Sequence, residues 1–121
     1  MLGIDDLRSH CFKKKGVSED LPFDESVLAV RVGKKIFALT NLDAEEFSVN
    51  LKAPPHQIID WREQFPNSVQ PGYHMNKKHW NTVFPNRGLK RETFLHMVDQ
   101  SYRSVFDTLT KKLKSEIHAL D

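Results

Sequence analysis

The chain has 121 residues, of which 39% are hydrophobic and 28% are charged, and its formal net charge at pH 7 is +2. This size and balance are typical of one folded domain and exclude disordered and fibrous proteins. We therefore expect a single domain over residues 1–121. No apolar run reaches the ~20 residues that cross a bilayer, so no membrane association is expected. A single cysteine and the lack of a secretory signal pattern favour a cytoplasmic location.

The first half of the chain predicts a helix followed by strands. Apolar residues recur at helical spacing before Gly16, and later runs alternate or are continuously apolar, as strands are. Gly33-Lys34 joins two strand-like runs, which predicts a tight hairpin with a type II′ turn. The expected segments are a helix over residues 3–15, an acidic turn-like segment over 17–26, and strands over 27–32, 35–40 and 47–52.

The second half predicts two more helices and one strand. Pro54-Pro55 suits the start of a helix, and the C-terminal segment shows the strongest helical periodicity of the chain. Thr108 and Thr110 are expected to break that last helix, because a threonine can cap a restart. The expected segments are a helix from Pro54 to Phe65, a loop over 66–78, a strand over 79–84 and helix from Leu89 onward.

This order of elements predicts an α+β fold. Strands that follow one another along the chain favour an antiparallel β-sheet meander. The N-terminal, middle and C-terminal helices would then cover one face of the sheet.

Positive charge is concentrated in residues 64–91. This stretch holds five Lys or Arg and no Asp or Glu, whereas residues 1–63 have a net charge of −2 and residues 92–121 a net charge of −1. A local basic surface attracts phosphate groups even when the whole protein is nearly neutral. An unevenly charged solvated surface is the alternative interpretation.

Pro71 to Val83 is the segment richest in binding chemistry. It contains two aromatic residues, two histidines, two lysines and two asparagines. Lysines neutralise phosphates, asparagine pairs with base edges, and aromatic rings offer stacking faces, although aromatics are more often buried. If residues 79–84 form a strand, we expect Trp80 on the core side, so that its polar neighbours form the working surface. A candidate small-molecule pocket in this segment comprises Tyr73, His74, Asn76 and Trp80.

Three segments together carry a resemblance to a known family. They are Gly16–Asp20 with Pro22-Phe23, Val32–Ala38, and above all Pro71–Val83. On these motifs the sequence resembles the MmcQ/YjbR family over nearly its whole length. The resemblance implies a CyaY-like, that is frataxin-like, α+β domain. It also implies a hairpin arrangement likened to a double-wing motif, and DNA binding by that analogy.

The first functional hypothesis is a DNA-binding module without enzymatic activity. The hairpin at Lys34-Lys35 would form one wing, and the segment around Lys77-Lys78 would lie near the second. The residues expected to contact DNA are Lys34, Lys35, Lys77, Lys78, His79, Asn81, Arg87, Lys90 and Arg91. The sequence identifies no protein partner, and we expect a monomer or a weak dimer.

The second hypothesis is a protein-interaction or small-molecule-binding regulatory module that does not bind nucleic acid. An acidic cluster over residues 19–25 could meet a basic partner or bind a metal weakly. The lysines at 13–15 match a frataxin-type acidic helix poorly, so we expect no metal and no other cofactor.

An enzyme is the third hypothesis. His74 and His79 lie five residues apart with Cys11 remote, which fits no familiar zinc spacing. No nucleophile-elbow, P-loop or dinucleotide motif is present. We therefore expect no catalytic residues, and we expect Cys11 to act as a small buried hydrophobic residue.

Overall fold

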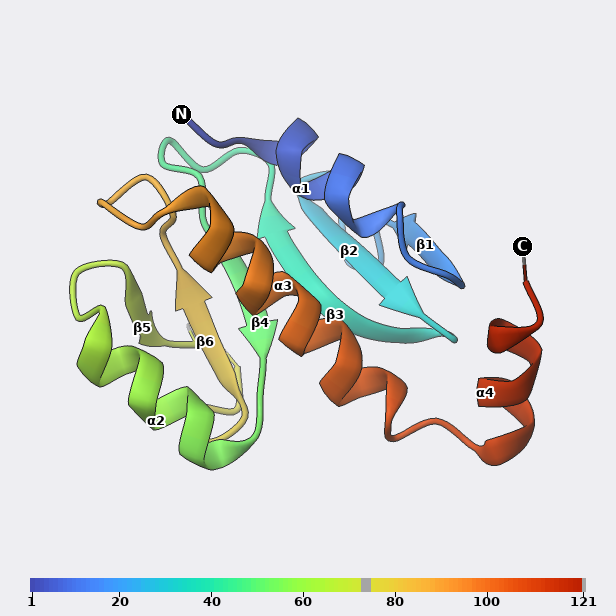
Figure 1. Ribbon diagram of the computed structural model, residues 1–121. Helices are drawn as coiled ribbons and strands as arrows, with labels where there is room; N and C mark the ends of the chain where they lie inside the picture. Colours follow the sequence, from blue (N-terminus) through green and yellow to red (C-terminus); the bar gives the residue numbers. More distant parts are fainter. Residues whose placement is uncertain (73–74, 121) are drawn as a thin grey trace.

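The computed structural model describes residues 1–72 and 75–120 of the chain. Within this part, an antiparallel six-stranded sheet carries helices on one face, which confirms the α+β prediction (Figure 1). The strands lie in the order β1-β2-β3-β4-β6-β5. Their bounds are β1 Val17–Asp20, β2 Val27–Val32, β3 Lys35–Asn41, β4 Val49–Lys52, β5 Val69–Pro71 and β6 Trp80–Val83. The helices are α1 Ile4–Cys11, α2 Pro55–Gln64, α3 Arg91–Phe106 and α4 Lys111–His118.

The hydrophobic core lies between the sheet and helices α1, α2 and α3. Alternation along β4 turns Val49 and Leu51 toward these helices, and Val83 of β6 lies beside Val49 in register. Burying each large apolar side chain contributes about 1.5–3 kcal/mol. Cys11 is fully buried, as predicted, and burial raises the pKa of its thiol to about 12. The largest fully buried side chains include Phe37, Phe94, Leu7, Leu51, Ile58 and Met97.

The C-terminal helical segment breaks where the threonines predict. Helix α3 ends at Phe106, and the Thr110 hydroxyl accepts a hydrogen bond from the Leu113 amide (3.2 Å) to cap α4. Helix α4 then turns back beside the end of the β2–β3 hairpin (Figure 1). The Ile117 side chain lies against Gly16.

Two strands were not predicted from the sequence. β1 lies in the segment expected to be turn-like, and β5 lies in the segment expected to be a loop. Both are short strands at the two edges of the sheet, each with one neighbour. An edge strand is hydrogen-bonded along one side only and therefore tolerates proline, so Pro71 ends β5 without breaking the sheet.

The hairpin between β2 and β3 is present, but its turn type was predicted wrongly. Gly33 has φ +54° and Lys34 has φ +75°, so both central residues are left-handed and the turn is type I′. A Cβ at Gly33 would lie 2.9 Å from the side chains of Leu109 and Leu113. Glycine is therefore required here both by the turn and by the close approach of the segment leading into α4.

Among the described residues, none of the helices combines the length and the apolar character that crossing a membrane requires.

Candidate nucleic-acid interface

One end of the sheet gathers lysines from several strands. β3 and β6 both run antiparallel to β4, so they begin at the same end, where β4 finishes at Lys52. Lys34 precedes β3, and Lys77 and Lys78 precede β6. The last turn of α3 brings Arg103 to this end as well, where it lines a hollow together with Lys52. We call this surface the cationic end: Lys34, Lys35, Lys52, Lys77, Lys78, His79 and Arg103.

A hollow of about 450 Å³ lies at the cationic end, between α3 and the β4–α2 connection. Its lining includes Lys52, His79 and Arg103, and the one carboxylate among the described lining residues is Asp107. Thr108 also lines the hollow, and its hydroxyl accepts a hydrogen bond from Lys35 Nζ (3.1 Å). The hairpin lysine is therefore tied to the same surface as the cations of β4 and α3.

The Lys77-Lys78 loop has a fixed backbone and exposed side chains. The Asn76 side chain accepts a hydrogen bond from the Lys78 amide (2.9 Å), and its carbonyl accepts one from Trp80 (3.0 Å). Arg62 of α2 donates to the Lys77 carbonyl, and desolvation lowers the pKa of this arginine. Neither lysine forms an ion pair with any residue that the structure describes. Both ammonium groups are thus available to a ligand.

Asn81 does not contribute to this surface, so its prediction as a DNA contact is wrong. Its side chain is 1% exposed, accepts a hydrogen bond from Arg62 Nε (2.7 Å) and donates one to the Ile58 carbonyl (3.1 Å). The faces of β6 are reversed relative to the prediction. Asn81 points toward α2, while the half-buried Trp80 lies on the helix-free face of the sheet.

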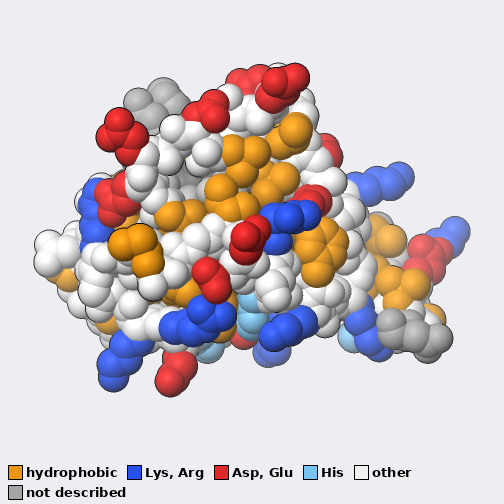
Figure 2. All heavy atoms as spheres, turned by 90° about the horizontal axis from the view of Figure 1, so that it is seen from above, with side chains coloured by type: hydrophobic (Ala, Val, Ile, Leu, Met, Phe, Trp, Pro, Cys, Tyr) orange, Lys and Arg blue, Asp and Glu red, His pale blue; other side chains and the backbone are white. Residues whose placement is uncertain are grey.

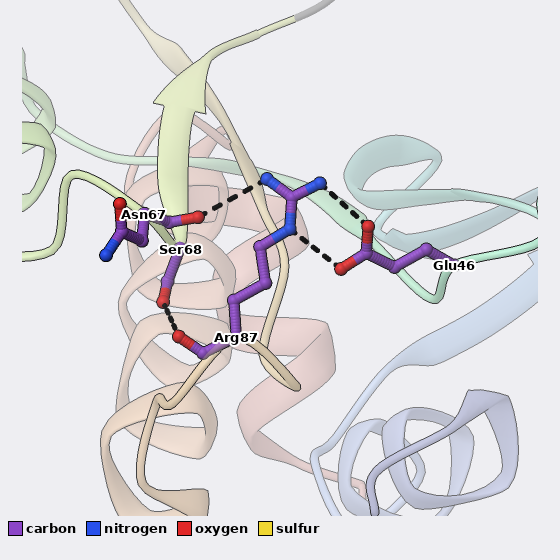
Figure 3. A network of polar contacts seen from close by, with 4 residues as sticks. All are labelled: Glu46, Asn67, Ser68 and Arg87. Atoms are coloured by element: carbon purple, nitrogen blue, oxygen red, sulfur yellow. Dashed lines mark hydrogen bonds and ion pairs between the residues drawn. The ribbon is translucent and has the colours of Figure 1, made fainter.

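Arg87 lies at the opposite end of the sheet, where β6 finishes. Its guanidinium donates to both carboxylate oxygens of Glu46 (2.8 and 2.7 Å) and to the Asn67 carbonyl (3.3 Å), as Figure 3 shows. It also lies 3.8 Å from the centre of the Phe84 ring. The hydrogen bond from Arg87 lowers the pKa of Glu46. Ser68 completes the network by donating to the Arg87 carbonyl (2.8 Å), so this arginine fixes the conformation of the loop.

Lys90 and Arg91 share that opposite end, because they open α3 there. Arg91 pairs with Asp6 of α1 (3.1 Å), and Lys90 occupies the N-cap position and is exposed. Figure 2 looks onto this end and shows Asp and Glu side chains along its upper margin, with hydrophobic side chains below them toward the middle of the face.

The fold therefore divides the acid-free segment between two surfaces. Lys77 and Lys78 join the cationic end, whereas Arg87, Lys90 and Arg91 do not. Sequence reasoning missed Lys52 and Arg103. Lys52 could have been found as the final outward residue of an alternating strand, but no local signal marks Arg103. Of the candidate pocket, Asn76 lies in the loop turn, and Tyr73 and His74 lie outside the described residues.

The motif-bearing part of the chain matches a known family. The family model described as YjbR matches residues 12–104, from the end of α1 into α3. The chain belongs to the YjbR family. This match includes β1 to β6 and the whole Lys77-Lys78 loop.

Individual relatives agree with this family membership. The chain is 33% identical to YbdF of Escherichia coli O157:H7 over 91 residues, covering 75% of this chain and 74% of YbdF. It is 27% identical to YjbR of Escherichia coli K12 over 109 residues, covering 90% and 92% of the two chains. The crystal structure of DR2400 from Deinococcus radiodurans matches with a TM-score of 0.92 and 33% identity, covering all of this YjbR-family chain and 91% of that protein. These names state no activity or ligand, so the comparisons establish family and fold.

Proposed function

We propose that this YjbR-family protein binds DNA through the cationic end and has no enzymatic activity. The proposal is supported by a hollow that Lys52 and Arg103 line, with a single carboxylate among its described lining residues. Lys35 of the β2–β3 hairpin donates to Thr108 of this lining, and the Lys77-Lys78 loop leads into His79, another lining residue. A cluster of this kind attracts phosphate groups and releases the counterions condensed on a duplex.

Phosphates, and not base edges, are the groups that this surface suits. Lysine ammonium groups act as point charges, whereas base readout usually uses bidentate arginine or asparagine. Asn81 is buried and bonded within the fold, and Arg87 is held by Glu46. We therefore expect DNA binding with little dependence on base sequence.

Salt dependence of duplex binding tests the proposal. With about five phosphate contacts, the slope of log K against log salt is expected to be about −4.5. The double variant Lys77→Gln/Lys78→Gln removes two contacts and brings the slope to about −2.7. Fluorescence anisotropy of a labelled duplex between ~50 and ~200 mM salt measures both values.

A matched control removes the same charge from the opposite end. Lys90→Gln/Arg91→Gln is expected to leave the slope unchanged, although both residues belong to the same acid-free segment. No binding at ~50 mM salt, or equal losses from the two double variants, would contradict the proposal.

A further inference from the structure

A larger hollow is lined by the residues that follow α1, the C-terminal half of α3 and α4. Figure 1 shows where these helices lie. The volume of this hollow is about 720 Å³, which is within the range of ~300–1,000 Å³ typical of small-molecule sites. We call it the helical cleft. Lysines follow α1 on one side, aromatic residues of α3 form the floor, and Ile117 and His118 of α4 form the other side.

The floor of the helical cleft is aromatic. Tyr102 and Phe106 lie one turn apart on α3, with ring centres 5.9 Å apart and planes 18° from parallel. The His118 ring meets Phe106 edge-on, with centres 5.2 Å apart. Phe106 and Tyr102 are half-buried, so their rings are partly open to solvent. Such a floor offers a flat apolar surface to a planar ring.

The charges around this floor are mainly positive. Asp99 lines the cleft, but Lys14 and His10 both contact its carboxylate. Desolvation raises the pKa of Asp99, and the hydrogen bonds from Lys14 and His10 outweigh that effect, so the net pKa is lowered. The negative charge of Asp99 is therefore already balanced by cationic side chains of the protein itself.

Besides Lys14 and Asp99, the lining of the helical cleft contains three cationic side chains and one carboxylate. Lys13, Lys15 and Arg103 line the cleft together with Asp107, which gives an excess of two positive charges. Lys13 and Arg103 have no ion-pair partner among residues 1–72 and 75–120. The lysines after α1 and the aromatic residues of α3 thus combine into one surface, which shares Arg103 with the cationic end.

Hydrogen bonds hold the walls of the helical cleft in place. The Tyr102 hydroxyl donates to the Lys15 carbonyl (2.6 Å), and Lys15 Nζ donates to the His118 carbonyl (3.1 Å). α1, α3 and α4 are connected through these two bonds, although they are distant in sequence. A site that is formed before the ligand arrives loses less conformational entropy on binding.

We propose that the helical cleft binds a small aromatic anion, a planar ring that carries a phosphate or a carboxylate group. The ring lies against Phe106 and His118, and the anionic group lies toward Lys13 and Arg103. Both parts of the ligand are needed, because the floor is apolar and the excess charge is positive. This site contains neither Lys77 nor Lys78, and variants of Lys13 and Phe106, which lie outside the cationic end, test it independently of DNA binding.

The test uses two aromatic anions and two partial ligands. Isothermal titration with adenosine monophosphate and with indole-3-acetate distinguishes a phosphate from a carboxylate, while adenosine lacks the charge and inorganic phosphate lacks the ring. At least one aromatic anion is expected to bind saturably at one site, with adenosine and phosphate each about ten-fold weaker.

Matched variants place the binding in the helical cleft. Phe106→Leu and Lys13→Gln are each expected to weaken binding about five-fold or more. Phe12→Leu and Lys112→Gln change an exposed phenylalanine and an exposed lysine outside the cleft, and less than about two-fold change is expected. Lys77→Gln/Lys78→Gln should leave this binding unchanged.

Three results would overturn the proposal. The first is no saturable binding of either aromatic anion up to about 5 mM. The second is adenosine or phosphate binding as tightly as the aromatic anion. The third is equal affinity in Phe106→Leu, Lys13→Gln and their controls, with circular dichroism showing that all four variants are folded.

Discussion

Ser101 joins helix α3 to two strands at a point where their pairing stops. β3 and β4 pair in register at Ala38 with Leu51 and at Leu39 with Asn50, so the next pair would be Phe37 with Lys52. The buried Ser101 hydroxyl lies there instead, accepting from the Lys52 amide (2.8 Å) and donating to the Phe37 carbonyl. We expect Ser101→Ala to leave both backbone groups without this partner.

The expected cost follows from these two hydrogen bonds. A buried backbone group that loses its partner costs about 1–3 kcal/mol. Alanine recovers about 0.5 kcal/mol through its higher helix propensity. Ser101→Ala should therefore lower the free energy of unfolding by about 1.5–5.5 kcal/mol, out of a total of about 5–15 kcal/mol. For a chain of this size the thermal midpoint should fall by about 10 °C.

Chemical denaturation followed by circular dichroism measures this difference. Ser115→Ala is the matched control, because Ser115 is an exposed serine within α4 and its loss should be neutral or slightly stabilising. If Ser101→Ala cost no more than ~0.5 kcal/mol, the strands would have closed to bond Phe37 with Lys52 directly. The Ser101 hydroxyl would then not substitute for a missing backbone hydrogen bond between β3 and β4.

Two other predictions concern a turn and an ion pair. In the same denaturation assay, Gly33→Ala should destabilise the protein by about 2 kcal/mol and Gly88→Ala by about 1 kcal/mol. Both glycines have positive φ, but of the two only Gly33 has side-chain neighbours within 4 Å of an added Cβ. Equal costs would show that the contacts with Leu109 and Leu113 add nothing to the cost at Gly33. The folded pKa of Asp99 is below the ordinary value of 3.8, so its ion pair with Lys14 stabilises the protein above that pH and is lost as pH falls through the folded pKa. The difference in thermal midpoint between the wild type and Asp99→Asn should therefore close below about pH 3.8, and a constant difference down to pH ~2 would contradict this assignment.

Local patterns predicted the elements that bury the most apolar surface. The C-terminal helical region follows from its apolar spacing, and its break follows from the capping threonine. β2, β3 and β4 follow from continuous or alternating apolar runs. β1 and β5 lack such runs because they are only four and three residues long and pair with one neighbouring strand each.

The reversed faces of β6 have a related cause. Residue type alone favours a buried tryptophan and an exposed asparagine. The fold instead provides Asn81 with two partners from α2, the Arg62 guanidinium and the Ile58 carbonyl. A buried amide with satisfied hydrogen bonds is stable, and its neighbour Trp80 must then point to the helix-free face.

The site was harder to predict because charges pair across long stretches of sequence. Arg87 meets a carboxylate 41 residues away, and Arg91 meets one 85 residues away. An acid-free window therefore does not imply an acid-free surface. The chemistry of the cations still separates their roles. The two arginines of this window form ion pairs within the fold, where a planar guanidinium matches a carboxylate, whereas Lys77 and Lys78 stay exposed. In this segment both arginines stabilise the fold, whereas the lysines stay exposed and only Lys77 and Lys78 lie at the cationic end.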